Sequence, residues 1–331
     1  MQAIVQDTYG STDVLELRSI DRPVIAADEV LVRVHAAGVD RGVWHLMTGL
    51  PYPVRLAGYG VRAPKTAVPG VDVAGVVDAV GTDVTRFRPG DEVFGIGVGT
   101  YAEFTRARES KLAIKPPDLG FVQAAVVPIS GLTALQGLRD HGRVVTGQRV
   151  LVIGASGGVG TFAVQVAKAY GAEVTGVCSS AKVDLVRSLG ADHVIDYTRD
   201  DVTELGHRYD VILDIGGNRS LSSLRRILAA SGVLVIVGAE TGGRWLGGSD
   251  RLLRALLLSP FVGQQLRPFI STENHDDLVT LVELIEAGKV SPIIDRIYPL
   301  AEVAKAIRHV EDGHARGKVA ITVTAASGAT A

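Results

Sequence analysis

A run of glycines in the middle of the chain is the strongest sign of chemistry in the sequence. Residues 150–160 read Val-Leu-Val-Ile-Gly-Ala-Ser-Gly-Gly-Val-Gly. Glycine lets the backbone approach a phosphate closely, and the N-terminus of a following helix offers unpaired N–H groups to an anion. The pattern predicts a pyrophosphate-binding loop of a dinucleotide site, although an ordinary strand–turn–helix junction is the alternative. The residues expected to hold the cofactor here are Gly154, Ser156, Gly157, Gly158, Val159 and Gly160.

The strand expected after this loop indicates which dinucleotide is bound. Enzymes that use NAD carry Asp or Glu about 20 residues after the loop, to hold the ribose 2′-hydroxyl. Here the segment 173–177 leads into Cys178, Ser179, Ser180 and Lys182, without a carboxylate at the strand end. Hydroxyls and an ammonium would bind a 2′-phosphate. We therefore expect NADPH, held by Ser179, Ser180 and Lys182; the alternative is a helix cap and a solvated lysine.

Alternating strands and helices must position this loop. From about residue 121 the chain alternates between short apolar runs and amphipathic stretches, which is typical of a parallel sheet covered by helices. Helices are expected at 161–170 and 183–189. Strands are expected at 149–153, 173–177, 193–195, 210–213, 233–237 and 266–270.

The two ends of the chain have a different pattern. The first 120 residues read as short strands with one helix near 42–48, and strands return at 293–298 and 318–323. The sequence therefore predicts an α/β protein of two domains. A β-rich domain would span 1–123 and be completed by 273–331, and a doubly wound Rossmann domain would span 124–272.

Composition restricts the partners that are expected. The 34 Lys and Arg nearly balance 36 Asp and Glu without forming a basic tract, so no nucleic-acid partner is expected. The sequence contains no uninterrupted run of about 18 apolar residues, so no membrane span is expected. The N-terminus does not have the pattern of a cleaved signal peptide. Cys178 is the sole cysteine, which excludes an intrachain disulfide. A cytoplasmic location is expected because no other address is recognised.

Five segments together resemble the medium-chain dehydrogenase/reductase superfamily, in its zinc-independent, quinone-oxidoreductase-like branch. They are 70–81 (Gly-Val-Asp-Val-Ala-Gly-Val-Val-Asp-Ala-Val-Gly), 87–95 (Phe-Arg-Pro-Gly-Asp-Glu-Val-Phe-Gly), 129–134, 190–197 and 314–319. The resemblance covers nearly the whole chain and implies a GroES-like catalytic domain beside the Rossmann domain. It also implies pairing of cofactor domains, so a homodimer is expected.

The resemblance bears on zinc. Zinc-dependent members bind the metal through a cysteine in the segment that here reads 38–40 and a histidine in the segment 69–72. Asp40 and Val71 occupy those positions, and valine has no ligand atom. The four-cysteine structural lobe is absent too. No metal is therefore expected.

The resemblance also implies further cofactor contacts. Thr133, Gly216, Val237 and Gly238 correspond to positions that line the nicotinamide pocket, and Tyr197 to a tyrosine near the adenine ribose phosphate. The alternative is that each of them is a turn residue.

The segment 39–52 lies where the family places its substrate cleft. Hydride addition to a carbonyl or quinone leaves negative charge on oxygen, which a nearby donor stabilises. His45 and Tyr52 are candidate donors, and Asp40 would orient His45 or contact the nicotinamide ribose. The alternative is that His45 only lines a helix, since quinone reduction does not require an acid from the protein.

Two further segments are candidates for specificity and assembly. The loop 53–68 carries Tyr59, Arg62 and Lys65, which would select a substrate if the loop acts as a lid; a solvated surface loop is equally consistent. The apolar run within 242–257 suits a subunit interface or a cleft wall.

Three functions remain open at this point. The first is NADPH-dependent hydride transfer to a small quinone or α,β-unsaturated carbonyl. The second is NADP-dependent interconversion of a ketone and an alcohol. The third is NADPH binding without turnover. All three need the glycine loop, and they differ at the substrate cleft.

Overall fold

A computed structural model describes residues 1–238, 243, 245 and 247–323, and the chain divides into two compact units. Unit 1 holds residues 1–129, 273–282 and the chain from 292 onward, and unit 2 holds 130–272 and 283–291. These bounds differ from the expected ones. Residues 124–129 belong to unit 1, where the Ile129 N–H donates to Asp72. Residues 283–291 belong to unit 2, where Ser291 exchanges hydrogen bonds with Gln165.

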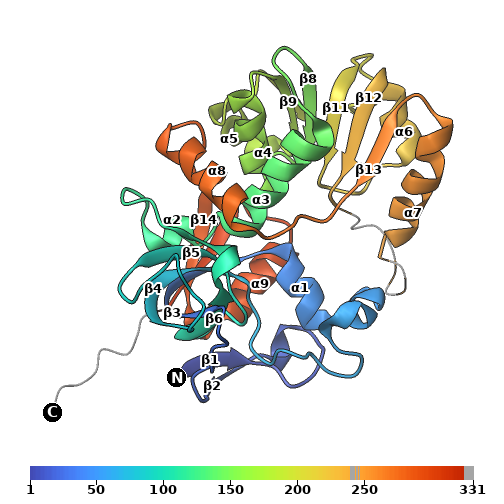
Figure 1. The fold of residues 1–331 in the computed structure, drawn as a ribbon. Coiled ribbons are helices and arrows are strands. Elements are labelled where there is room, and N and C mark those ends of the chain that lie inside the picture. The colour runs from blue at the N-terminus through green and yellow to red at the C-terminus, as the bar shows by residue number, and fades with distance from the viewer. Residues whose placement is uncertain (239–242, 244, 246, 324–331) are drawn as a thin grey trace. The chain divides into compact units, whose positions relative to one another are not determined.

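Unit 1 is built on a seven-stranded sheet that joins the two ends of the chain. Its order is β14-β15-β3-β4-β5-β7, with β6 paired to β3. In Figure 1 the edge strand β14 is red, from the C-terminal part of the chain, whereas β3 is blue and β4 and β5 are teal. Antiparallel pairing of β15 with β3 aligns Val319 with Val39 and makes the C-terminal segment part of the core. The strands are β3 (Glu29–Val39), β4 (Asp72–Val80), β5 (Glu92–Ile96), β6 (Phe104–Arg108), β7 (Leu112–Ile114), β14 (Ile294–Pro299) and β15 (Lys318–Thr322), and a separate hairpin joins β1 (Gln2–Val5) and β2 (Glu16–Ser19).

Unit 2 is built on a six-stranded parallel sheet. Its order is β10-β9-β8-β11-β12-β13, so the chain runs outward from β8 in one direction and then from β11 in the other. This is the 3-2-1-4-5-6 order of a Rossmann fold. The central strands are apolar and buried, as expected when helices cover both faces. The strands are β8 (Arg149–Ile153), β9 (Glu173–Cys178), β10 (His193–Asp196), β11 (Tyr209–Asp214), β12 (Leu228–Ile236) and β13 (Gln265–Pro268).

The helices of the described residues follow the expected periodicity with shifts at their ends. Helix α4 begins three residues before the expected 161, because the glycines of the loop form its first turn. A short helical turn at Arg55–Tyr59 occupies the segment expected as a loop. The α-helices are α1 (Arg41–Thr48), α2 (Phe121–Ala124), α3 (Pro128–Gln136), α4 (Gly158–Ala169), α5 (Val183–Ser188), α6 (Leu221–Ile227), α7 (Ser249–Leu258), α8 (His275–Glu286) and α9 (Val303–Glu311).

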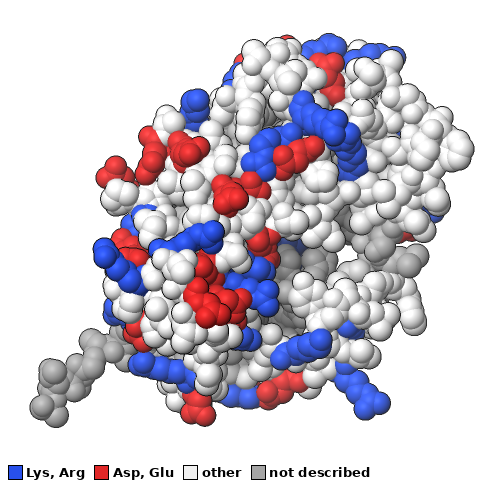
Figure 2. Space-filling view, in the orientation of Figure 1, with Lys and Arg blue, Asp and Glu red and all other residues white. Residues whose placement is uncertain are grey.

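The charges on the surface and the lengths of the helices agree with what the composition predicts. On the face shown in Figure 2, acidic and basic side chains are interspersed. Within the described ranges, none of the helices has the length and apolar character needed to cross a membrane. The expected α/β architecture, with a β-rich unit and a Rossmann sheet, is confirmed.

Candidate active site

The glycine loop lies between β8 and α4, where a dinucleotide phosphate would meet the start of a helix. Gly154 has a φ of 88°, which favours glycine. Gly157 is the N-cap of α4, so Gly158, Val159 and Gly160 form its first turn and present N–H groups. A Cβ at Gly160 would lie 2.0 Å from the Gly154 carbonyl oxygen, so only glycine fits there. The loop therefore has the open cradle and the helix start that a pyrophosphate requires.

Two strand ends meet beside this loop. Because β8 and β11 are neighbours although β9 and β10 intervene in sequence, the strand order reverses between them, and open α/β sheets bind ligands at that point. A Cβ at Gly154 would lie 3.5 Å from the Gly216 amide nitrogen. Val237 and Gly238 follow β12 and donate their N–H groups to the Asp214 carbonyl. The structure thus brings Gly154, Gly216 and Gly238 to one edge of the sheet.

A buried ion pair that sequence reasoning missed braces these strand ends. Arg251 of α7 contacts the Asp214 carboxylate and donates to the Gly238 carbonyl at 3.3 Å. Asp214 also accepts from the Gly217 N–H at 3.2 Å. Burial raises the pKa of Asp214 above its usual value, and Arg251 opposes that rise. Arg251 had no sequence signal, since it lies within an apolar run.

A carboxylate of the neighbouring strand β10 lies beside the end of β9. Asp196, the last residue of β10, contacts the Ser180 hydroxyl and accepts from the Thr198 hydroxyl at 2.7 Å. Hydrogen bonding from Ser180 lowers the pKa of Asp196 below its usual value, so the carboxylate stays ionised at neutral pH. Sequence reasoning missed Asp196 because parallel pairing of β9 with β10 sets Cys178 opposite Asp196, 18 residues away along the chain.

The other residues expected to bind the cofactor differ in their exposure. Ser179 and Lys182 are half-buried, and Tyr197 is 56% exposed beside them, with its N–H bonded to the Cys178 carbonyl. Thr133 is buried in α3, and its hydroxyl lies 3.0 Å from that of Ser271. Tyr197 therefore offers an open aromatic face, whereas Thr133 is part of a packed helix.

Unit 1 contains a buried cluster of charged side chains around Asp40. Lys318 of β15 contacts Asp40, the residue before α1. The Lys318 Nζ also lies 3.3 Å from the Asp72 carboxyl of β4. All three are at most 9% exposed. Burial, followed by repulsion from Asp40, raises the pKa of Asp72 well above its usual value. Burial alone would lower the pKa of Lys318, but the two carboxylates outweigh it and raise that pKa. The cluster therefore holds a Lys318–Asp40 pair beside Asp72, the carboxyl whose pKa is raised by burial.

Asp40 is thus committed to the core of unit 1. Tyr101, fully buried, donates to the Gly38 carbonyl at 3.1 Å, and burial raises the pKa of its hydroxyl. A Cβ on Gly38 would lie 2.7 Å from Asp72. The ion pair with Lys318 ties Asp40, which lies between β3 and α1, to β15.

His45 lies in the last turn of α1, half-buried, with Nδ1 2.8 Å from the Leu50 carbonyl oxygen. A carbonyl only accepts, so Nδ1 carries the proton, and the neutral ring presents Nε2 as an acceptor. Tyr52 lies under Arg55, whose guanidinium is 5.0 Å from the Tyr52 ring centroid and 4.4 Å from that of Tyr9. His45 and Tyr52, two of the three expected catalytic residues, therefore make contacts within the turn that follows α1.

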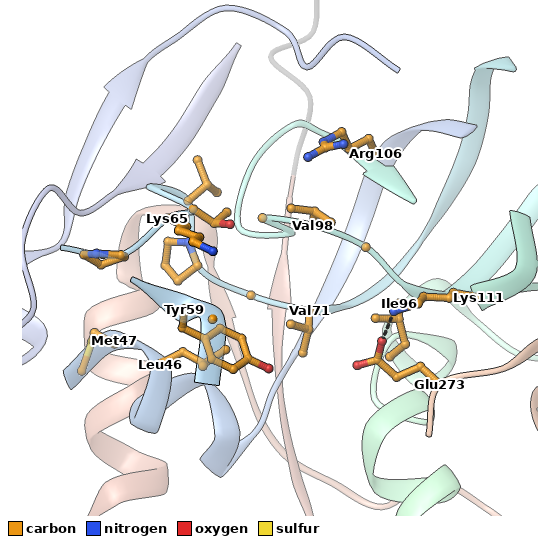
Figure 3. A pocket seen from close by; sticks show the side chains of 18 of the residues that line it. Leu46, Met47, Tyr59, Lys65, Val71, Ile96, Val98, Arg106, Lys111 and Glu273 are labelled. Atoms are coloured by element: carbon orange, nitrogen blue, oxygen red, sulfur yellow. Dashed lines mark hydrogen bonds and ion pairs between the residues drawn. The ribbon is translucent and has the colours of Figure 1, made fainter. Parts of the chain in front are cut away.

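A cavity of about 560 Å³ opens in unit 1 beside this turn (Figure 3). That volume suits a drug-sized molecule. Val71 lies in the middle of the wall in Figure 3, with Tyr59 and Lys65 on one side and Ile96, Lys111 and Glu273 on the other. Leu46 and Met47 of α1 line it as well, whereas Asp40, His45 and Tyr52 do not. The cavity, with its mostly apolar floor, is the candidate substrate site.

Comparison with known proteins places the chain among oxidoreductases. Residues 26–118 match the family described as an alcohol dehydrogenase GroES-like domain, and residues 189–321 match one described as a zinc-binding dehydrogenase. The chain is 36% identical to a mitochondrial NAD(P)H oxidoreductase of Mus musculus, covering 98% of this chain and 89% of the relative. It is 35% identical to a chloroplastic NADPH-dependent alkenal/one oxidoreductase of Arabidopsis thaliana, covering 97% and 79%. The solved quinone oxidoreductase of Coxiella burnetii has a TM-score of 0.84 at 29% identity, covering 98% and 99%.

The names of these relatives correct one expectation. The mouse protein is named as mitochondrial and the Arabidopsis protein as chloroplastic, which contradicts the cytoplasmic location expected from the sequence. That expectation was wrong because it rested only on the lack of a recognised targeting segment.

Three observations point to the same family: the order of the motifs, the Rossmann strand order of unit 2 and the extent of these similarities. The expected family is confirmed, and so is the expectation of an enzyme. The chain is an oxidoreductase that belongs to the medium-chain dehydrogenase/reductase superfamily, in its quinone oxidoreductase branch.

Proposed function

We propose that the protein is a zinc-free, NADPH-dependent reductase of quinones or α,β-unsaturated carbonyl compounds. The observation that carries the proposal is the glycine cradle at the reversal of strand order in unit 2, where Gly154, Gly157 and Gly216 leave room for a pyrophosphate. Relatives named as alkenal/one and quinone oxidoreductases support the choice of acceptor.

The residues at the family's catalytic zinc positions do not fit a zinc ion. Val71 has no donor atom, and Asp40 is buried in an ion pair with Lys318. A zinc ion there would need to displace an ammonium that is itself fully buried. Among the described residues, no group of three His, Cys, Asp or Glu side chains is arranged to hold a metal. No step of the proposed reaction uses a metal.

Bound NADPH supplies the hydride. The chain's own residues bind the cofactor and manage the charge that develops on the acceptor oxygen. Because His45 donates through Nδ1 to Leu50, it delivers a proton from Nε2 only as an imidazolium. A quinone accepts hydride without such help, since water protonates the product. Because His45 does not line the unit 1 cavity, this proton would reach an acceptor there through a water molecule, and the role proposed for His45 concerns enones more than quinones.

NADPH is proposed over NADH because Ser179, Lys182 and the exposed Tyr197 surround the end of β9. Asp196 acts against this preference. Its carboxylate binds the Ser180 hydroxyl, which would otherwise be available to a 2′-phosphate, and repels that phosphate. The protein is therefore proposed to prefer NADPH over NADH, and Asp196 is expected to make this preference smaller.

A homodimer is proposed from an apolar surface of unit 2. On α7, Leu253, Leu256 and Leu257 are 57%, 56% and 63% exposed, and Phe261 follows at 86%. Contiguous exposed apolar side chains of this kind mark interaction sites. Gly242, Arg244 and Leu246, in the run expected at an interface, lie outside the described residues. Sedimentation velocity of the wild type and of a Leu253→Glu/Leu257→Glu variant tests the dimer, and a monomeric wild type would refute it.

NADPH oxidation by the chelator-treated protein tests the reaction. The panel contains quinones, enones and simple ketones, and NADH is compared with NADPH. Turnover of quinones or enones that survives chelation is expected. Turnover of simple ketones alone would point instead to ketone/alcohol interconversion, and NADPH binding without any turnover would point to a binding protein.

A further inference from the structure

The lining of the unit 1 cavity carries more positive than negative charge. The charged side chains that line it are four basic ones and two acidic ones, namely Lys65, Arg106, Arg108 and Lys111, and Glu29 and Glu273. The lining therefore has two positive charges in excess. Three of the basic groups have an acidic neighbour: Arg106 lies 2.8 Å from Glu29, Arg108 lies 3.8 Å from Asp28, and Lys111 contacts Glu273.

Lys65 is the exception. Within the part of the chain that the structure describes, its ammonium has no ion pair with an acidic side chain. Figure 3 places Lys65 near Tyr59, on the side of the cavity opposite Lys111 and Glu273. The cavity thus has one side where the positive charge is uncompensated.

The segment that carries Lys65 is held in place. The Tyr9 hydroxyl contacts the carbonyl oxygens of Tyr59 and Gly60 at 3.0 and 2.6 Å, and the Lys65 N–H donates to the Tyr59 carbonyl at 2.9 Å. The start of the segment is fixed by Arg55, which donates to the Gly49 carbonyl at 2.9 Å. An ammonium on an anchored backbone loses less freedom on binding than one on a free loop.

The rest of the cavity is apolar. Its floor and walls include the aliphatic and thioether side chains of Leu46, Met47, Val68, Val71, Ile96 and Val98. A pocket with an apolar body and one uncompensated cation is complementary to a molecule with an apolar body and one anionic group.

We infer that this cavity binds an electron acceptor that carries an anionic group, a carboxylate or another monoanion, which pairs with Lys65 while the apolar part of the acceptor lies against Val71 and Ile96. The inference rests on the proposed function, because it names the substrate class of the same reaction. It extends that function by assigning Lys65 as the residue that selects charged acceptors.

A matched pair of enones tests the inference. The probes are 4-(3-oxobut-1-enyl)benzoate and its methyl ester, which share the reacting enone and differ in charge. The wild type is expected to show a kcat/KM about tenfold higher for the carboxylate, and this advantage should shrink as salt is raised. Equal kcat/KM values for the two probes would overturn the inference.

Variants at position 65 separate charge from structure. Lys65→Met is expected to lower kcat/KM for the carboxylate about tenfold and to leave the ester within about twofold, whereas Lys65→Arg should keep the preference. Lys305→Met, which removes an exposed lysine of α9 outside the cavity, is the control and should match the wild type. A loss of equal size for both probes in Lys65→Met would contradict a charge-selecting role.

Calorimetry with 4-phenylbutyrate distinguishes this inference from the proposed reaction. The compound carries the carboxylate and an apolar body but has no group to reduce. Binding to the wild type that is weakened about tenfold in Lys65→Met supports the anion site even where no acceptor is turned over. Equal binding by both proteins, or none by either, would reject the site even where neutral quinones are reduced.

Discussion

Lys318 and Asp40 form a buried ion pair although they lie 278 residues apart in the sequence. The pair joins β15, near the C-terminus, to the residue before α1, and so couples the closure of the sheet to the helix that lines the cavity. Asp72 completes the cluster on β4. Asp40 therefore acts in the position and fold of α1.

The buried ion pair predicts a large effect of removing its cation. Lys318→Met leaves the Asp40 carboxylate buried without a counter-charge and should lower the free energy of unfolding by about 3–5 kcal/mol. Asp72→Asn should cost only about 1 kcal/mol, because burial already disfavours the charged form of Asp72 and asparagine keeps an acceptor for the Ile129 N–H. Urea unfolding measures both. A Lys318→Met variant as stable as Lys305→Met would contradict the role of the pair.

The raised pKa of Asp72 predicts how stability depends on pH. Its usual value is 3.8, so above about pH 4 the folded chain holds a proton that the unfolded chain has lost. The contribution of Asp72 to stability therefore falls as pH rises from about 4 toward the folded-state pKa. Asp72→Asn removes this titration, so the stability of the variant relative to the wild type should rise across that interval. A difference that does not change with pH would show that the Asp72 pKa is not raised.

Asp196 predicts a change in cofactor selectivity. Asp196→Asn removes the charge beside the proposed 2′-phosphate and should raise the ratio of kcat/KM for NADPH over NADH about tenfold. Asp201→Asn is the matched control, since Asp201 also accepts from a threonine two residues on and lies outside the end of β9. An unchanged ratio in Asp196→Asn would place the ribose elsewhere.

Two glycines of the loop should respond differently to alanine. A Cβ at Gly160 would lie 2.0 Å from the Gly154 carbonyl, so Gly160→Ala should lower the Tm of the cofactor-free protein. A Cβ at Gly157 would meet that carbonyl at 3.5 Å, an ordinary contact, so Gly157→Ala should keep its Tm and bind NADPH more weakly. Differential scanning fluorimetry with and without NADPH measures both effects. Unchanged NADPH affinity in Gly157→Ala would argue against a phosphate at this loop.

His45 should matter for one class of acceptor. His45→Gln keeps a donor for the Leu50 carbonyl but has no proton to transfer, so kcat with an enone should fall about 100-fold, the lower range for general acid catalysis. Turnover of a quinone should stay within about twofold. If both rates are unchanged, His45 has no role in proton transfer.

The sequence was sufficient for the features that depend on local pattern. The glycine spacing at 154–160 and the alternation after residue 121 predicted the loop, the helix α4 and the parallel sheet, because each depends on residues close in the chain. The contacts of Asp196 with Ser180 and of Arg251 with Asp214 could not be predicted, because they depend on which strands and helices become neighbours. Lys318 belonged to a recognised motif, yet only the pairing of β15 with β3 shows that it meets Asp40.

The central claim is zinc-free hydride transfer from NADPH to an activated double bond. It is tested most directly with NADPH deuterated at the transferred position of C4, an enone acceptor and protein treated with a chelator. The account predicts turnover with a primary isotope effect and deuterium at the β-carbon of the saturated ketone. Deuterium on the carbinol carbon, or activity that chelation abolishes and zinc restores, would contradict it.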